Sequence, residues 1–187
     1  MHLADLLTPD RIRLDLRASD KWDLIGQLSA IASETLARPH LLSRRAQGID
    51  VESRDAVVAR EESHSTGIGH GCALPHARIP GLQRPVACLA VLAQPVDFGS
   101  PDRVPVHVVC LLLIPEDQPS LALKMLAEFA GVLSEERALE SIRAAGDPAA
   151  IHELIRIRGE EKQHPVTARS IMRQPYFDIH PDTPLTE

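Results

Sequence analysis

Residues 60–78, with the sequence REESHSTGIGHGCALPHAR, hold the side chains best suited to chemistry. Three histidines, one cysteine and three glycines fall within this short stretch. Its first part, residues 61–71, is polar and glycine-rich, which predicts a loop. Loops that are held on a rigid sheet commonly carry binding and catalytic residues, so we expect the functional site here.

His76 is the predicted acceptor of a phosphoryl group. An imidazole with an ordinary pKa is mostly neutral at cytosolic pH, and the neutral form is the nucleophile. Phosphoryl transfer depends on in-line positioning and on donors for the phosphoryl oxygens. Pro75 restricts the backbone just before His76. It can therefore hold the ring at a fixed angle, with one nitrogen bonded and the other free.

The residues before His76 can supply the donors that a phosphoryl group needs. Glycines let backbone N–H groups approach an anion, and hydroxyl and guanidinium groups add donors. The predicted supporting residues are Arg60, Ser65, Thr66, Gly67, Gly69 and Gly71. Glu61 and Glu62 are interpreted as a solvated pair, since transfer between imidazoles needs no general base.

Zinc binding is a weaker alternative for the same segment. The candidate ligands are His64, His70, Cys72 and His76, because imidazole and thiolate both bind zinc. Their spacing, H-x5-H-x-C-x3-H, matches no usual structural zinc signature, and alternation along a strand separates the side chains. We predict neither a metal nor a cofactor.

The first part of the chain predicts a strand and two helices. Apolar and charged residues alternate over 11–17, as in a half-buried strand. Ser19 or Asp20 can cap the next helix, whose apolar residues recur at helical spacing until Pro39 limits it. Residues 43–60 predict a second, less regular helix.

The central part predicts strands, and helices follow them. Candidate strands are residues 72–79, 85–93 and 104–114, and the last two are nearly continuous apolar runs. Such runs are typical of strands covered on both faces. Candidate helices are residues 119–133, 135–144 and 148–157. The order predicts an α/β fold, in which a mixed β-sheet of about five strands is sandwiched between helices.

Composition excludes several classes of function. The net charge is −6 and aromatic residues make up only 3%, which argues against nucleic acid as a partner. Three cysteines form no paired framework, as in a reducing compartment. No apolar stretch approaches the roughly 20 residues of a membrane span, and no signal peptide begins the chain. We therefore expect a cytoplasmic protein without membrane insertion.

Over about residues 3–157 the chain resembles enzyme IIA of the bacterial phosphotransferase system, of the fructose/mannitol type that includes the nitrogen-regulatory branch. Residues 60–78 carry the resemblance, with Asp97–Phe98, the run LLIPEDQ and the helix around Leu126. The resemblance implies that His76 takes its phosphoryl group from a histidine phosphocarrier protein (HPr or its nitrogen-branch counterpart). It also implies that Arg60 and Thr66 support the site, and that a regulatory member acts on a further protein, here unknown.

One departure from the family pattern affects the proposed transfer. Family members usually carry a second histidine near the start of the helix after the PEDQ-like turn. Here Ala122 occupies that place, and Lys124 is the nearby side chain that can partly replace a donor. The alternative function is therefore a non-catalytic enzyme IIA-like module, which regulates a partner by binding without phosphoryl turnover.

The C-terminal residues carry a second resemblance. Residues 166–187, VTARSIMRQPYFDIHPDTPLTE, resemble the opening of a CBS domain. The predicted organisation is an enzyme IIA-like domain over 1–157, a charged linker over 158–165, and the truncated beginning of a CBS-like domain over 166–187. A segment this short cannot bury a core of its own.

Overall fold

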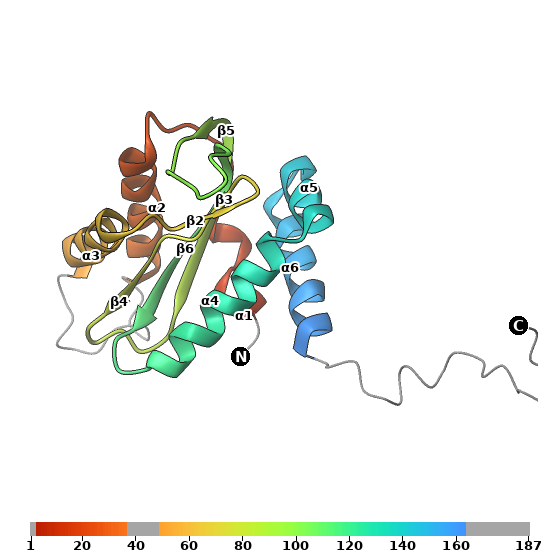
Figure 1. Cartoon of the computed structure of the whole chain (residues 1–187). Coiled ribbons are helices and arrows are strands. Elements are labelled where there is room, and N and C mark those ends of the chain that lie inside the picture. The colour runs from red at the N-terminus through yellow and green to blue at the C-terminus, as the bar shows by residue number, and fades with distance from the viewer. Residues whose placement is uncertain (1–2, 37–48, 164–187) are drawn as a thin grey trace, which may run out of the picture.

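A mixed β-sheet of six strands lies between two layers of helices in the computed structural model (Figure 1), which describes residues 3–36 and 49–163. In chain order the elements are α1 (Leu3–Leu6), η1 (Pro9–Arg11), β1 (Ile12–Leu16), α2 (Lys21–Leu36), α3 (Ile49–Ser63), β2 (Gly67–Gly69), β3 (Cys72–Ala73), β4 (His76–Ile79), β5 (Val86–Val96), β6 (Val106–Pro115), α4 (Pro119–Leu133), α5 (Glu136–Ala144) and α6 (Pro148–Gln163). The predicted fold class is confirmed.

The sheet is built around an antiparallel pair, β5 and β6. β1 lies parallel to β5 on one side. On the other side both β3 and β4 lie parallel to β6, and β2 pairs with β3 in the antiparallel direction. This arrangement brings the start of β4, where His76 lies, against the middle of β6.

Two hydrophobic cores fill the spaces on either side of the sheet. One lies under α1, α4, α5 and α6, and the other lies under α2 and α3. Alternate residues of β6 enter different cores: Cys110 and Leu112 face the first, while Leu111 and Leu113 face the second. Because both faces are covered, β5 and β6 need apolar residues at nearly every position.

The loop segment predicted over 61–71 differs from its prediction in two respects. Its first residues, 61–63, form the end of α3. Residues 67–69, predicted as loop, form the short strand β2. Pro75 divides the predicted strand 72–79 into β3 and β4, since proline has no N–H for the ladder. Its carbonyl oxygen still accepts a hydrogen bond from Leu112 N at 2.9 Å. The new strand β2 and the division at Pro75 turn the four candidate strands into the six of the sheet, one more than the predicted total of about five.

The last helix is longer than predicted. α6 continues through Gln163, so residues 158–163, predicted as the first part of a linker, are helical. Arg156 forms ion pairs with Glu153 and Glu160 at helical spacing, which stabilises this extension. Gly159 also lies against Leu3, 3.7 Å from where a Cβ would be. The rest of the linker and residues 166–187 lie outside the described residues.

None of the helices in residues 3–36 and 49–163 is long and apolar enough to cross a membrane.

Candidate functional site

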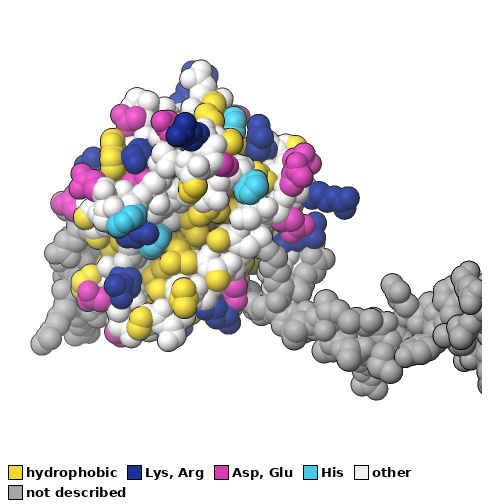
Figure 2. Space-filling view, viewed as in Figure 1, with side chains coloured by type: hydrophobic (Ala, Val, Ile, Leu, Met, Phe, Trp, Pro, Cys, Tyr) yellow, Lys and Arg dark blue, Asp and Glu magenta, His cyan; other side chains and the backbone are white. Residues whose placement is uncertain are grey.

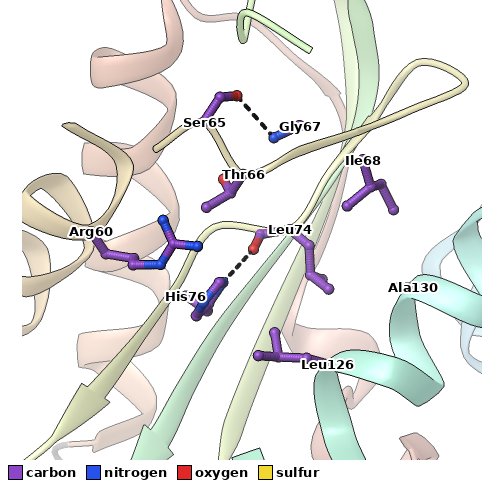
Figure 3. A pocket seen from close by; sticks show the side chains of 9 residues that line it. All are labelled: Arg60, Ser65, Thr66, Gly67, Ile68, Leu74, His76, Leu126 and Ala130. Atoms are coloured by element: carbon purple, nitrogen blue, oxygen red, sulfur yellow. Dashed lines mark hydrogen bonds between the residues drawn. The ribbon is translucent and has the colours of Figure 1, made fainter. Parts of the chain in front are cut away.

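A cavity opens between the end of α3, the loop into β2, the start of β4 and one face of α4 (Figure 3). Its volume is about 230 Å³. Its lining consists of Arg60, Ser65, Thr66, Gly67, Ile68, Leu74, His76, Leu126 and Ala130. Figure 2 shows hydrophobic side chains gathered over the space between β4 and α4, with basic side chains and histidines along one border.

His76 lies half-buried at the start of β4, on the wall of this cavity. Its Nδ1 lies 2.9 Å from the carbonyl oxygen of Leu74. A carbonyl only accepts hydrogen bonds, so Nδ1 carries the proton of the neutral ring and Nε2 keeps its lone pair. The predicted arrangement, with one ring nitrogen bonded and the other available, is present.

The surroundings of His76 favour the neutral ring. Burial lowers the pKa of His76, and the positive charge of Arg60 lowers it further. The bond to Leu74 and the charge of Glu61 act in the opposite direction, but the pKa still lies below its ordinary value. A neutral imidazole with an available nitrogen lone pair is a nucleophile.

Arg60 supplies the positive charge of the cavity. It lies in the last turn of α3, and its Nη1 donates a hydrogen bond to the carbonyl oxygen of His64 at 2.8 Å. This bond uses one of the five N–H groups of the guanidinium. In Figure 3 the guanidinium points from α3 toward His76. The two residues therefore form a cation and a nucleophile on neighbouring walls.

The hydroxyl groups predicted as phosphate donors are engaged inside the protein. Thr66 Oγ1 lies 2.5 Å from Glu61 Oε2, and the Thr66 N–H donates to the same oxygen at 2.8 Å. Ser65 Oγ donates to the carbonyl oxygen of Phe98 at 2.6 Å and accepts from the Gly67 N–H at 3.1 Å. Ser65, Thr66 and Gly67 thus line the cavity, but these bonds hold the wall itself together.

The interpretation of Glu61 as a solvated residue is wrong. Its side chain is fully buried, and Lys21 Nζ donates to its Oε1 at 3.0 Å. Glu62, one position further on, is exposed as predicted. No local pattern could reveal the difference, since Lys21 lies 40 positions earlier in the chain.

Three predicted phosphate-binding residues lie outside the cavity lining. Gly69 and Gly71 flank His70 in the β2–β3 turn, with φ angles of +87° and +75°. Glycine adopts these positive φ angles without strain, so both residues are needed to form the turn. In the turn, Asp102 accepts a hydrogen bond from the His70 N–H at 2.7 Å. Lys124 is largely exposed and lies 3.7 Å from Glu128.

The side of the cavity formed by α4 is apolar. Leu126 and Ala130 line it, and Ala122, one turn earlier on the same helical face, is buried in the core. Sequence reasoning did not identify Leu126, Ala130, Ile68 or Leu74 as lining residues. In the sequence these residues follow the same patterns as ordinary core residues. Leu126 and Ala130 recur at helical spacing, and Ile68 and Leu74 are apolar residues of the segment before Pro75.

The zinc alternative gains no support from the geometry. Cys72 is buried with its Sγ 3.4 Å from the carbonyl oxygen of Leu133, and burial raises its pKa to about 12. His64 and His70 are exposed. Among the described residues, no group of three His, Cys, Asp or Glu side chains is arranged to hold a metal ion.

Residues 5–157 match the family described as "Phosphoenolpyruvate-dependent sugar phosphotransferase system, EIIA 2". A nitrogen regulatory protein of Bradyrhizobium diazoefficiens is 31% identical over 155 residues, which cover 83% of this chain and 95% of that protein. The nitrogen regulatory protein of Escherichia coli K12 is 32% identical over 156 residues, covering 83% and 90%.

Solved structures of related proteins share the fold. The crystal structure of the nitrogen regulatory protein IIA-Ntr from Neisseria meningitidis superposes with a TM-score of 0.71 at 25% identity, covering 82% of this chain and 98% of that one. The mannitol IIA protein of Escherichia coli, at 17% identity and a TM-score of 0.61, shares the fold over 79% of this chain and 97% of its own.

Proposed function

The chain belongs to the EIIA 2 family of the phosphoenolpyruvate-dependent sugar phosphotransferase system, and we propose that it accepts a phosphoryl group from a histidine phosphocarrier protein on Nε2 of His76. The observation that carries the proposal is the half-buried imidazole, with Nδ1 held by Leu74 and the ring on a cavity wall beside Arg60.

The proposed step balances with no cofactor. The Nε2 lone pair of His76 forms a bond to phosphorus as the P–N bond to the carrier's imidazole breaks, and that electron pair stays on the leaving ring. Each ring keeps the proton on its other nitrogen. The positive charge that develops on the His76 ring is stabilised by the Leu74 carbonyl, which accepts from Nδ1–H. Arg60 balances the charge of the phosphoryl oxygens.

The apolar surface around the cavity is the proposed docking site of the carrier. Ile68 and Leu126 lie at the cavity, and Leu123 on the same helix is 72% exposed. Exposed apolar patches of this kind mark protein–protein contacts. The similarity to nitrogen regulatory proteins supports a regulatory role toward a further protein, which is not identified, and we propose that the protein acts in the cytoplasm.

Phosphoryl labelling tests the proposal. The protein is incubated with enzyme I, the phosphocarrier protein and phosphoenolpyruvate, and the acid-labile label is measured. We expect label on the wild type and none on His76→Ala. His64→Ala is the matched control, because it removes an exposed histidine, and it should be labelled like the wild type. Equal labelling of His76→Ala would contradict the proposal.

A second candidate function is regulation by binding without phosphoryl turnover. The apolar α4 side and the engaged hydroxyls of Ser65 and Thr66 favour it, since they leave Arg60 as the main polar support among the lining residues. A wild type that binds the phosphocarrier but stays unlabelled would support this function over the first. The CBS-like interpretation of residues 166–187 and the domain boundary near residue 157 remain predictions.

A further inference from the structure

An ion pair between the buried Glu61 and the partly exposed Lys21 lies directly behind one wall of the cavity. The carboxylate of Glu61 bonds Lys21 Nζ through Oε1, and the Lys21 ammonium lies 4.6 Å from the centre of the Trp22 ring. Burying an ionised carboxylate is costly unless its oxygens are hydrogen-bonded. Here both oxygens are engaged, so the pair is well placed to hold neighbouring groups in one position.

The second oxygen of Glu61 holds Thr66 at two points. It accepts from the backbone N–H at 2.8 Å and from Oγ1 at 2.5 Å. An ionised carboxylate only accepts, so the single hydroxyl proton of Thr66 points to Glu61. In this arrangement Thr66 is a fixed part of the cavity wall, and its hydroxyl has no proton to donate to a phosphoryl oxygen.

The wall formed by residues 65–67 is held from two directions. Glu61, in the last turn of α3, connects Thr66 to Lys21 at the start of α2. Ser65 connects the same loop to Phe98, which follows β5. His76 and Arg60 lie on the neighbouring walls. Movement of the loop would therefore change the space beside His76 without altering any residue that touches the phosphoryl group.

We propose that Glu61, held by Lys21, is a positioning residue for phosphoryl acceptance, because it fixes Thr66 and with it the cavity wall next to that of His76. This inference rests on the function proposed above. Glu61 touches neither the carrier nor the phosphoryl group. Its loss therefore lowers the rate of transfer within the docked complex and leaves docking unchanged. A misplacement of about 1 Å is enough to cost about a hundredfold in rate.

The test compares the rate and the KM for the phosphocarrier between variants of the full chain. We expect Glu61→Gln to lower the rate of labelling about 10- to 100-fold with an unchanged KM. Glu62→Gln is the matched control, because it removes an exposed carboxylate from the next position of the same helix, and its rate should equal that of the wild type. Lys21→Met removes the ion pair to the other oxygen of the same carboxylate and should also lower the rate. It is used if Glu61→Gln does not fold.

A double-mutant cycle separates positioning from simple stabilisation. If Glu61 acts through Thr66, then Thr66→Val lowers the rate, and adding Glu61→Gln lowers it by much less than Glu61→Gln does alone, because only the bond to the Thr66 backbone N–H remains to be weakened. Thr66→Ser keeps the hydroxyl and should restore most of the rate. Additive losses in the double variant would overturn the inference.

The outcomes also separate this inference from the function on which it rests. A labelled wild type with an unchanged rate in a folded Glu61→Gln or Lys21→Met protein would overturn only the role of Glu61. A wild type that accepts no label would overturn the proposed function and this inference together. A lower melting temperature with an unchanged rate would assign the ion pair to stability alone.

Discussion

The orientation of one imidazole ring depends on backbone geometry at residues 74–76. Pro75 separates two short strands, and the chain turns so that the Leu74 carbonyl faces Nδ1 of His76 at 2.9 Å. The bond selects the tautomer and leaves Nε2 as the basic nitrogen. Burial and Arg60 then keep the ring neutral by lowering its pKa. The same few atoms thus determine both orientation and protonation.

The shifted pKa of His76 predicts how phosphoryl acceptance depends on pH. Only the neutral ring attacks, so the rate should rise with pH and level off above the pKa of His76, which lies below 6.5. Arg60→Gln removes a charge that lowers this pKa, so the midpoint should move to higher pH. NMR titration of the ring measures the midpoint. Arg78→Gln, an exposed arginine of β4, is the control, and a wild-type midpoint above 6.5 would contradict the prediction.

Gly67 is required by close packing against Ser100. A Cβ at position 67 would lie 2.2 Å from Ser100 Oγ and 3.0 Å from its Cα. We therefore expect Gly67→Ala to lower the free energy of unfolding by about 1–3 kcal/mol, measured by denaturant titration. Adding Ser100→Gly should restore part of this loss, since only the backbone contact remains.

Gly146 provides the control for this substitution. Among the described residues other than its two chain neighbours, no atom lies within 4 Å of the position of its missing Cβ, so Gly146→Ala should change the free energy of unfolding by less than about 0.5 kcal/mol. Equal stability of Gly67→Ala and the wild type would show that the wall can shift to admit a methyl group.

At the scale of elements, α4 has two functions on two faces. Its buried face, with Met125, Phe129 and Leu133, packs into the core. Leu126 and Ala130 line the cavity, while Leu123 faces solvent. Residues three or four positions apart share a face of a helix, so this spacing places the core residues on one face of α4 and the cavity-lining residues on another. A helix that is fixed by its core face can present a rigid apolar surface to a partner.

An exposed leucine on such a helix should contribute to docking and little to folding. We expect Leu123→Ser to weaken docking of the phosphocarrier by about 1–2 kcal/mol, seen as a higher KM, with the melting temperature unchanged. Ile157→Ser on α6 is the control, because Ile157 is also an exposed apolar residue and does not line the cavity. Equal KM values for the two variants would place the carrier elsewhere.

At the scale of the whole molecule, the sequence predicts the layers better than the site. The apolar runs of β5 and β6 correctly indicate a sheet covered on both faces, since an unbroken apolar run reflects burial on both sides of a strand. The position of His76 is also predictable, because its neighbours lie within one segment. The bond between Lys21 and Glu61 is not, since it joins residues 40 positions apart and forms only when α2 and α3 pack together.

The hydroxyl donors of the loop show why the chemistry of the site cannot be predicted without the three-dimensional structure. Ser65 and Thr66 are the right residue types for binding a phosphoryl group, but Phe98 and Glu61 already accept their protons. A sequence shows which polar groups are present, but it cannot show which of them form hydrogen bonds with one another. The α4 wall of the cavity has the same limitation, because an apolar lining residue follows the same periodicity as a core residue.

The three cysteines can report on unfolding of the whole molecule. Cys72, Cys88 and Cys110 are all buried in the sheet, and burial raises the pKa of Cys72 and of Cys88 to about 12 and that of Cys110 well above its usual value. Thiolate is the reactive form, so at pH 8 a thiol reagent should modify none of them until the sheet opens. Modification in native buffer should therefore be slow and follow the equilibrium population of the open state, and all three thiols should react at once in denaturant. Mass spectrometry of the modified protein counts the thiols that have reacted, and rapid modification of one cysteine in native buffer would show that its strand opens independently of the rest.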